Sequence, residues 1–472
     1  MADITVRLYC MSQHIERFMA IAGTPGVSIG VMTKENPIFF DNHGFRNVEK
    51  KLLITEDTIF PIRSLAKAIT AAGIGNILLG SEDVMEHVNN RPLVRPFRSQ
   101  FGYNNLHYEL AGFVIEQVSG QSYFDFMQSR LLDPLGMERT SFQTPPKSVD
   151  NVTVCYNALE NASIVPIDFL KIGDGGYGAA SCGARSPVKD LVKLYSSFVK
   201  GFVSQFSGST TLDDAPPLKQ LNHIMSAKIP FDQPSQHEAF YTFGWGKVQL
   251  PRRFGQIGLN RALLPQGIPI IGRGTSSLVL FHQGILPGLL IFVALLPETE
   301  TVIVVLTNSL ALNDAADWMG QLIIEDIVNV PSKLRTDFVR VAEATVAENL
   351  KWYLRVVDEL EKGRKAGTLP KPFAEYVGTY WHDLHKFKID VKLVGDKLYW
   401  LMQGLETQNK RLELAHYHDD TFTWLQSRGE LASRGRWVGS DQGATFWKVK
   451  FEASESANIN KLSGVPDRSM EA

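Results

Sequence analysis

The chain has 472 residues, of which 44% are hydrophobic and 21% charged, as is ordinary for a soluble globular protein with one large and one smaller domain. The formal net charge of −2 gives no electrostatic basis for binding nucleic acid or an anionic membrane surface. Cys10, Cys155 and Cys182 form no disulfide framework and no Cys-x-x-Cys metal cluster, so we expect neither a metal nor another cofactor.

The N-terminal residues lack the charged start and long apolar core of a secretory signal. The apolar run 289–296 is too short for a membrane span and is typical of a buried strand. We therefore expect a cytoplasmic protein without a membrane partner. The sequence predicts no particular oligomeric state.

The first elements alternate between helix and strand. Residues 13–22 have the pattern of a short helix, and a Gly-Thr-Pro-Gly turn separates them from an apolar strand at 27–32. Residues 37–44 follow as the hairpin partner of that strand. Good helix formers then predict a helix at 61–79, after which the stretch 80–100 is polar and unpatterned.

The motif Ser64-Leu-Ala-Lys67 lies in the first turn of the helix predicted at 61–79. The serine is near free backbone N–H groups and the positive end of the helix dipole, and Lys67 lies one turn above it. A hydroxyl is a weak nucleophile at neutral pH, but a partly desolvated amine beside it can accept its proton. The pair is therefore a candidate nucleophile and base.

The same spacing occurs at Ser186/Lys189 and at Ser197/Lys200, where we expect structural roles. Ser186 precedes a proline and has the pattern of a helix N-cap, whereas Ser197 is near the end of the predicted helix with a solvent-facing lysine. The first pair differs because its helix is rich in small residues. Such a helix can be buried tightly, and burial shifts the pKa of a lysine.

The motif Tyr103-Asn-Asn105 opens a second helical region. Apolar residues recur at helical spacing from Leu106 to Gly120, and another helix is predicted at 123–132. Loops on rigid scaffolds often carry functional residues. A tyrosine at a helix start, taken alone, is nevertheless more often a packing residue.

Residues 173–183 are glycine-rich, but no Gly-Lys-Ser/Thr follows, so a close-packed turn is favoured over a phosphate cradle. A helix is predicted from Pro187 to Lys200. Polar loop with one amphipathic segment is predicted at 202–235, and a strand at 243–248.

Three strands are predicted at 277–285, 289–296 and 301–308, followed by a helix at 313–328. The last two strands are apolar and joined by a tight turn, which predicts a buried antiparallel hairpin. The first strand carries the motif His282-Gln-Gly284. Taken alone, His282 has the pattern of a hydrogen-bonded core histidine, and its distance from other histidines argues against a metal site.

The C-terminal third has a different pattern. Residues 331–372 are read as a helical linker that becomes loop at 363–372. Residues 373–451 alternate at period two and predict a small antiparallel barrel or sandwich. The polar tail 452–472 is expected to be disordered.

The three motifs, taken in order with their flanking sequences, resemble the serine β-lactamase-like superfamily. The resemblance is strongest to the branch of class C β-lactamases, D-amino-acid peptidases and esterases (peptidase family S12), and it covers about residues 13–328. It implies an α/β (α+β) domain at 1–330 with an antiparallel sheet flanked by helices and a helical subdomain. Some members add a lipocalin-like barrel, which 373–451 resembles.

The resemblance also implies roles for individual residues. Ser64 would be the acylated nucleophile, Lys67 its base or proton relay, and Tyr103 the group that passes the proton to the leaving group. Asn105, His282 and Gly284 would bind substrate. The backbone N–H groups of Ser64 and Ile285 would form the oxyanion hole.

Two departures from the family pattern bear on function. Family members have a longer, mostly helical insertion where this chain has the short stretch 80–100, which reflects either a more open cleft or a segment lost from the gene model. His282 replaces the lysine of β-lactamases, as in esterase-like and acyltransferase-like members, and argues against β-lactam hydrolysis.

The leading hypothesis is a serine hydrolase that cleaves an ester or amide of a small molecule through a Ser64 acyl-enzyme. An acyltransferase or transesterase of secondary metabolism using the same site is one alternative. A non-catalytic member that binds a ligand is the other.

Overall fold

The structure is a computed structural model of the 472-residue chain. It describes residues 4–34, 38–62, 64–65, 96, 99–168, 178–207, 218–231, 236–382, 385, 388–404, 411–439, 442–453 and 459–464. The predicted base Lys67, most of the short stretch 80–100 and residues 173–177 lie outside this part of the chain. The chain forms two compact units, residues 1–346 and 347–472.

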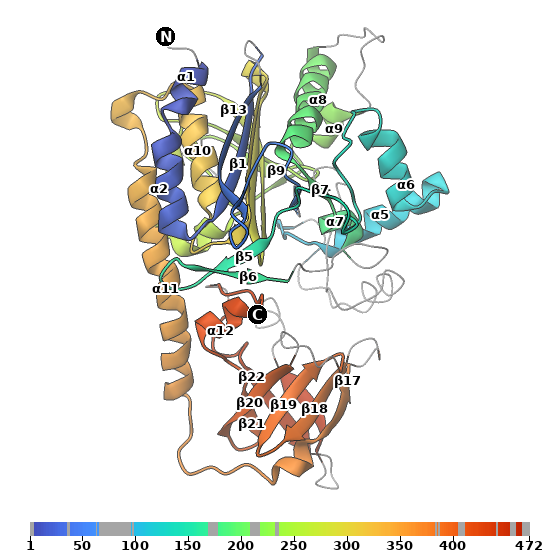
Figure 1. Ribbon diagram of the computed structural model, residues 1–472, viewed down its shortest axis with the longest axis vertical. Coiled ribbons are helices and arrows are strands. Elements are labelled where there is room, and N and C mark those ends of the chain that lie inside the picture. Colours follow the sequence, from blue (N-terminus) through green and yellow to red (C-terminus); the bar gives the residue numbers. More distant parts are fainter. Residues whose placement is uncertain are drawn as a thin grey trace. The chain divides into compact units, whose positions relative to one another are not determined.

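A nine-stranded antiparallel sheet forms the centre of the first unit (Figure 1). Its spatial order is β3 (Leu52–Leu53), β2 (Phe39–Asn47), β1 (Gly26–Met32), β15 (Thr301–Thr307), β14 (Leu289–Leu296), β13 (Leu278–Leu286), β10 (Gly246–Gln249), β9 (Ala239–Tyr241) and β8 (Ile229–Pro230). Strands β14 and β15 are buried along their whole length, which explains the apolar sequence of β14 and of β15 between its two terminal threonines. The predicted hairpin of these two strands is confirmed.

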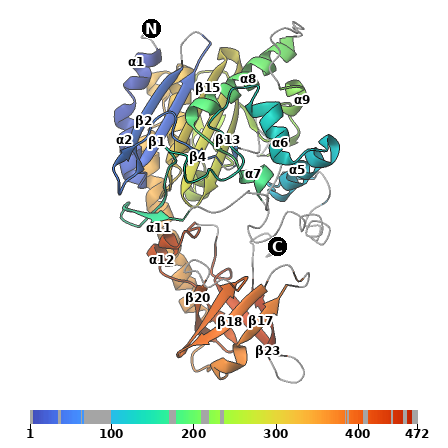
Figure 2. The same cartoon turned by 45° about the vertical axis from the view of Figure 1, so that its right-hand side comes forward.

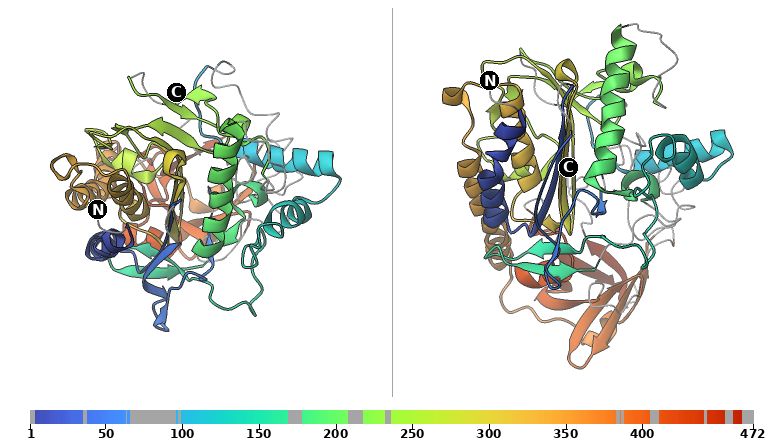
Figure 3. Two further views of the ribbon diagram at one scale, coloured as in Figure 1. Left: turned by 90° about the horizontal axis from the view of Figure 1, so that it is seen from above. Right: turned by 45° about the horizontal axis from the view of Figure 1, so that its top comes forward.

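Helices cover both faces of this sheet, as Figures 1 and 3 show. One face carries α10 (Ala315–Ile327), with α2 (Ser12–Ala22) packed beside it and α1 (Ile4–Tyr9) preceding α2. The other face carries α8 (Val188–Ser207), which packs against β1 and β15. The main hydrophobic core lies on the α8 face, where apolar residues of α8 pack against alternate residues of β14 and β15.

A smaller helical group lies beside α8 (Figure 2). It contains α5 (Leu106–Ser119), α6 (Tyr123–Met127) continued by a π-helical turn (Gln128–Leu132), and α7 (Ala179–Cys182). A Cβ on Gly112 of α5 would lie 2.6 Å from the Cβ of Ala180, so α5 and α7 pack very closely. This confirms close packing for the described part of the glycine-rich segment.

Short pairings and turns complete the first unit. The strand pairings are β4 (Phe60–Pro61) with β7 (Arg185–Ser186), β5 (Cys155–Ala158) with both β16 (Ser309–Leu310) and β6 (Ile164–Ile167), and β11 (Arg252–Arg253) with β12 (Ile270–Ile271). The helical turns are α9 (Leu221–Ile224), η4 (Leu259–Leu263), η5 (Pro297–Thr299) and η6 (Ser332–Leu334). Helix α11 (Phe338–Lys362) occupies much of the predicted linker 331–372.

The second unit contains a seven-stranded antiparallel sheet (Figure 2). In sequence and spatial order its strands are β17 (Gly378–Trp381), β18 (Lys388–Val394), β19 (Lys397–Met402), β20 (Arg411–His418), β21 (Thr421–Thr423), β22 (Lys448–Ala453) and β23 (Ile459–Gly464). The first and last strands come close enough to nearly close a barrel around buried aromatic residues such as Trp400, Phe422 and Trp447. The unit also has η7 (Phe373–Tyr376) and α12 (Arg428–Ser433).

The predicted fold class, an antiparallel sheet flanked by helices plus a small all-β barrel, is confirmed. Two predictions of loop or disorder are wrong. Helix α8 continues to Ser207, although loop is predicted from residue 202; α9 lies in the same range, for which one amphipathic segment is predicted. Within the tail predicted to be disordered, residues 459–464 form β23 and pair with β22. None of the described helices combines the length and the apolar character needed to cross a membrane.

Candidate active site

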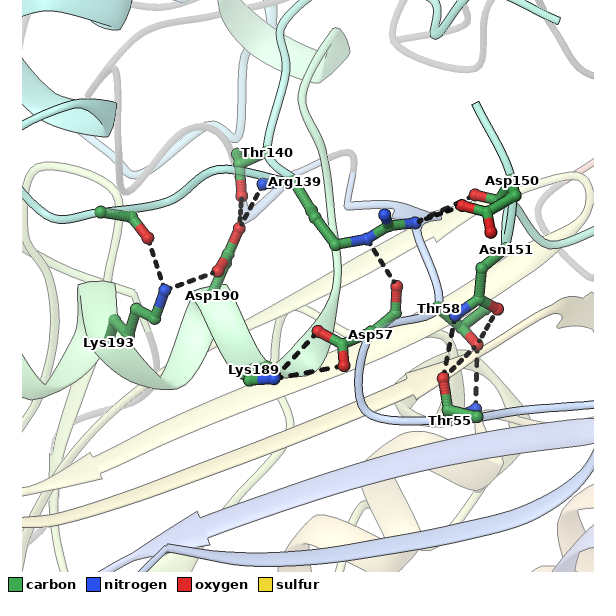
Figure 4. A network of polar contacts seen from close by, with 11 residues as sticks. Thr55, Asp57, Thr58, Arg139, Thr140, Asp150, Asn151, Lys189, Asp190 and Lys193 are labelled. Atoms are coloured by element: carbon green, nitrogen blue, oxygen red, sulfur yellow. Dashed lines mark hydrogen bonds and ion pairs between the residues drawn. The ribbon is translucent and has the colours of Figure 1, made fainter. Parts of the chain in front are cut away.

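Polar contacts hold the segment that leads to Ser64 (Figure 4). The carboxylate of Asp57 forms an ion pair with Lys189 at 3.2 Å, and its carbonyl oxygen accepts a hydrogen bond from Arg139 Nε at 3.1 Å. Arg139 also donates to the carbonyl oxygen of Asp150 at 2.9 Å. These contacts tie the chain before the predicted nucleophile to the start of α8 and to the loop at 139–150.

A second set of contacts fixes the turn at residues 55–58 (Figure 4). The Thr58 hydroxyl accepts the N–H of Thr55 at 2.9 Å and donates to Asn151 Oδ1 at 2.8 Å, while Asn151 Nδ2 donates to the Thr55 hydroxyl. The chain then pairs with β7, and the N–H of Ile62 donates to the Ala184 carbonyl. The position of Ser64, two residues later, is therefore set by backbone pairing.

Ser64 is buried, and helical structure begins at the next residue, Leu65. The helix predicted from residue 61 starts later, because Phe60–Pro61 form β4 and Ser64 lies in the turn before Leu65; the rest of that helix and Lys67 lie outside the described residues. A Cβ built on Gly284 would lie only 3.5 Å from the backbone N of Ser64. The first and third motifs, more than two hundred residues apart, are therefore brought together.

Strand β13 has an open edge beside this contact. Its residues Leu278–Phe281 pair with β10 on one side, but that pairing ends before His282, whereas β14 pairs along the other side as far as Leu286. In the described part of the chain, no strand pairs with the β10 side of residues 282–286. Ile285 is on this segment, which is where the family resemblance would place an extended substrate.

Tyr103 and His282 meet in the structure, which links the second and third motifs. The Tyr103 hydroxyl lies 3.5 Å from His282 Nε2 and also faces the Ser64 side chain. The Tyr241 hydroxyl of β9 lies 3.5 Å from the same nitrogen and 3.0 Å from the hydroxyl of Tyr108. The histidine is fully buried between the two tyrosines.

These surroundings keep Tyr103 protonated in the free protein. Burial of the hydroxyl raises the pKa of Tyr103 well above its usual value, and the hydrogen bond to Ser64 opposes this only in part. The side chain is still 37% exposed, so its ring borders solvent while its hydroxyl points inward. Tyr103 is thus suited to donating or relaying a proton next to Ser64.

Asn105 immediately precedes α5, as predicted, but its side chain does not cap the helix. Its Oδ1 is buried and makes no hydrogen bond to any described residue. Four residues later, the buried carboxylate of Glu109 accepts the N–H of Ser181 at 3.0 Å. This contact holds α5 against α7, whose Cys182 lies near Tyr103.

The other two Ser-x-x-Lys pairs are structural. Ser186 is part of β7 and its hydroxyl lies 2.7 Å from that of Thr140, so the predicted helix N-cap is wrong. Lys189 pairs with Asp57. Ser197 lies in the middle of α8, not near its end, because the helix extends to Ser207.

A separate groove of about 600 Å³ lies between α2, the start of β1 and the β5–β6 turn. Its lining includes Glu16 and His43, and a hydrogen bond with Asp41 raises the pKa of His43. None of the predicted site residues lines this groove. It lacks the serine, tyrosine and histidine arrangement and is not the candidate active site.

Sequence reasoning missed Tyr241, Tyr108 and Glu109. Tyr241 belongs to a three-residue strand in a region with no recognisable motif, and Tyr108 and Glu109 share the pattern of ordinary residues in a helix. No local signal marks them, because their significance comes from contacts between distant segments.

Substitution of Gly284 by alanine should disturb both packing and reactivity. The added Cβ would lie 2.5 Å from Ile291 Cγ1 and close to the Ser64 backbone. We expect a loss of about 1–3 kcal/mol in the free energy of unfolding, as for other overpacked cores, and slower acylation of Ser64. Urea denaturation and the labelling rate with a serine-reactive probe would measure these effects.

Gly378→Ala in β17 is the matched control, because a Cβ there would meet only the Tyr380 side chain at 3.8 Å or more. Normal stability and labelling in Gly284→Ala would show that Ser64 does not depend on close approach to this strand.

Both parts of the chain match known sequence families. The sequence model of the beta-lactamase family matches residues 11–81 and 75–325. Its two segments meet between the first and second motifs, where the sequence analysis finds the shortened stretch. Residues 363–471 match a domain of unknown function, DUF3471.

Curated relatives are distant. The chain is 27% identical over 194 residues to the mouse "Serine beta-lactamase-like protein LACTB, mitochondrial", covering 40% of this chain and 34% of that protein. It is 22% identical over 320 residues to the "Unguisins hydrolase ungD" of Aspergillus violaceofuscus, covering 64% and 51%. The chain therefore spans a third to a half of these relatives.

A solved structure supports the fold. The octameric penicillin-binding protein homologue from Pyrococcus abyssi superimposes with a TM-score of 0.50 at 18% identity, covering 89% of this chain and 94% of that one. At this identity the similarity shows the fold alone.

Proposed function

Because this chain belongs to the beta-lactamase family of serine hydrolases, we propose that it hydrolyses an ester or amide of a small molecule through an acyl-enzyme on Ser64. The observation that carries the proposal is the approach of Gly284 to the Ser64 backbone, together with the Tyr103 hydroxyl between Ser64 and His282. Three separate segments thus supply a nucleophile, a proton-relay group and a substrate-binding strand.

In the proposed reaction, Ser64 Oγ attacks the substrate carbonyl carbon while its proton passes to Lys67, directly or through the Tyr103 hydroxyl. The N–H groups of Ser64 and Ile285 stabilise the negative charge on the carbonyl oxygen. Tyr103 then donates a proton to the departing alcohol or amine, which leaves Ser64 acylated. A water molecule attacks the ester bond to Ser64, releasing the acid and returning the proton to the site.

Aromatic side chains near the site favour a bulky, apolar acyl or leaving group. The Phe101 ring lies 4.8 Å from that of Tyr241 and 5.8 Å from that of Phe231, and Tyr103 borders the same group. Such rings offer a large contact area for apolar ligands. Among the relatives, the protein named unguisins hydrolase also supports hydrolysis.

The decisive experiment supplies a simple acyl ester with and without a panel of alcohols and amines and follows the products by mass spectrometry. Release of free acid that depends on Ser64 is the expected result. Acyl transfer that clearly outruns acid release would make the protein an acyltransferase. Absence of both reactions, and of fluorophosphonate labelling, would favour a non-catalytic binding protein.

A further inference from the structure

Two carboxyl groups are buried on the face of the sheet that α10 covers. Asp314 and Asp317, in the first turn of α10, are both 0% exposed. Asp314 caps the helix by accepting the N–H of Asp317 at 3.1 Å. Among the described residues, no Lys, Arg or His forms an ion pair with either carboxyl group. Uncharged polar groups must therefore stabilise these buried carboxyl groups.

Side-chain amides supply that polarity. Asn260 Nδ2 donates to Asp317 Oδ2 at 3.0 Å and to the carbonyl oxygen of Asp314 at 2.9 Å, and its Oδ1 accepts the N–H of Asp314. The amides of Gln283 and Gln321 also face Asp317 and favour its ionised form. Both glutamines are buried, and their amides face Asp317 without a hydrogen bond of standard length to any described residue.

Glycines allow the backbone to approach this cluster. Gln283 of β13 lies opposite Phe292 of β14, and a Cβ on Gly320 of α10 would lie 2.2 Å from the Phe292 ring. Helix α10 therefore lies directly on the sheet at the position of Gln283. Gly255, with φ of +98°, leaves room on the other side, where a Cβ would come within 3.0 Å of Asp317 Oδ2.

The position of Gln283 connects this cluster to the candidate active site. Successive residues of a strand point to opposite faces, so His282 and Gly284 face Ser64 and Tyr103 while Gln283 points to α10. We propose that Asp317 is a positioning residue for β13: it gathers the amides of Asn260, Gln283 and Gln321 and so holds the strand that presents His282 and Gly284 to Ser64. This inference rests on the proposed function.

The positioning of β13 by Asp317 should depend on pH, because Asp317 can lose its charge. Burial raises the pKa of Asp317 to about 6, although the neighbouring amides of Gln321, Asn260 and Gln283 oppose the rise. Burial and the neighbouring Asp317 raise the pKa of Asp314 well above its usual range. Asp314 is the titratable group that faces Asp317, and the other groups named here are uncharged amides. Asp317 is therefore charged at pH 7 and neutral below about pH 6, where its hold on the amides weakens.

The test compares Asp317→Asn with the wild-type chain. We expect kcat for a simple ester to fall about ten- to a hundredfold with little change in KM, since small misplacements of a reacting group cost this much. The decline in kcat on acidification through pH 6 should also disappear. Hydrogen–deuterium exchange of a peptide covering 278–286 should accelerate, whether or not the chain is catalytically active.

Asn313→Ala is the matched control. Asn313 is buried next to Asp314, but its amide donates to Ala342 O and Thr345 Oγ1 of α11, each at 3.0 Å. Its loss should lower stability without changing kcat, the pH profile or exchange in β13. Gln283→Met, which removes the amide but keeps the acidic pair, should reproduce the kcat loss and covers the case in which Asp317→Asn does not fold.

The outcomes separate the two proposals. Unchanged kcat, pH profile and β13 exchange in Asp317→Asn, or in Gln283→Met if only that variant folds, would overturn the positioning role. Faster exchange in β13 together with a wild-type chain that neither labels nor turns over substrate would overturn the proposed function and leave the anchor of β13 supported.

Discussion

Replacing Ser64 by alanine is expected to abolish labelling by a fluorophosphonate probe and to lower kcat for the substrate ester by at least about 10⁴-fold. The reason is chemical: without Oγ there is no atom to carry the acyl group. The change is small in volume, and the backbone N of Ser64 next to Gly284 is retained, so the fold and the substrate-binding edge of β13 should persist. Intact-protein mass spectrometry and steady-state kinetics would measure the effect.

Ser197→Ala is the matched control, because it removes the serine of an identical Ser-x-x-Lys spacing. Ser197 lies within α8, where its hydroxyl donates to the Lys193 carbonyl. Labelling and turnover should be unchanged. Labelling of Ser64→Ala at the wild-type rate would show that another residue is the nucleophile and would remove the acyl-enzyme from the proposal.

The central strands could be predicted because their burial leaves a simple signature. The strands at 289–296 and 301–308 are covered on both faces, so both runs are apolar apart from Thr301, Thr307 and Asn308 at the ends of the second, and a turn separates them. Strand β23 has only two apolar residues among its six and is partly exposed, so its sequence resembles a disordered tail. Its pairing with β22, a tertiary interaction, determines its structure.

The candidate site divides in the same way. Ser64, Tyr103 and His282 belong to motifs with fixed local spacing, and the fold brings them together. Tyr241 and Asp317 have no such signal. Tyr241 reaches His282 only because β9 adds to the sheet next to β10, and Asp317 resembles an ordinary residue of a first helical turn until the burial of α10 is known.

The free energy of unfolding of the chain should depend on pH because Asp317 is buried. A carboxyl group whose pKa is raised from 3.8 to about 6 by folding contributes stability that is fully present below pH 3.8 and is lost as the pH rises through about 6. Wild type should therefore lose stability between pH 4 and pH 6, whereas Asp317→Asn should not. The free energy of unfolding of the variant minus that of wild type should rise over this pH range. Urea denaturation at several pH values would show this, and a constant difference would contradict a raised pKa.

Tyr103→Phe is expected to lower kcat/KM by about 10²–10⁴-fold, the range typical of a lost general acid–base group. The ring contacts with Tyr241 and His282 would remain, while the hydroxyl between Ser64 and His282 would be lost. Because burial keeps this hydroxyl protonated, its absence should slow departure of a poor leaving group most. Esters with good leaving groups, such as nitrophenyl esters, should therefore be less affected than alkyl esters.

Tyr241→Phe is a closely matched comparison, since both hydroxyls lie 3.5 Å from the same nitrogen of His282. The Tyr241 hydroxyl also contacts the hydroxyl of Tyr108, whereas the Tyr103 hydroxyl faces Ser64. We expect Tyr241→Phe to cost about tenfold or less, with no dependence on the leaving group. If both variants lose activity equally and without regard to the leaving group, the tyrosines act only by orienting His282, and Tyr103 does not relay the proton of Ser64.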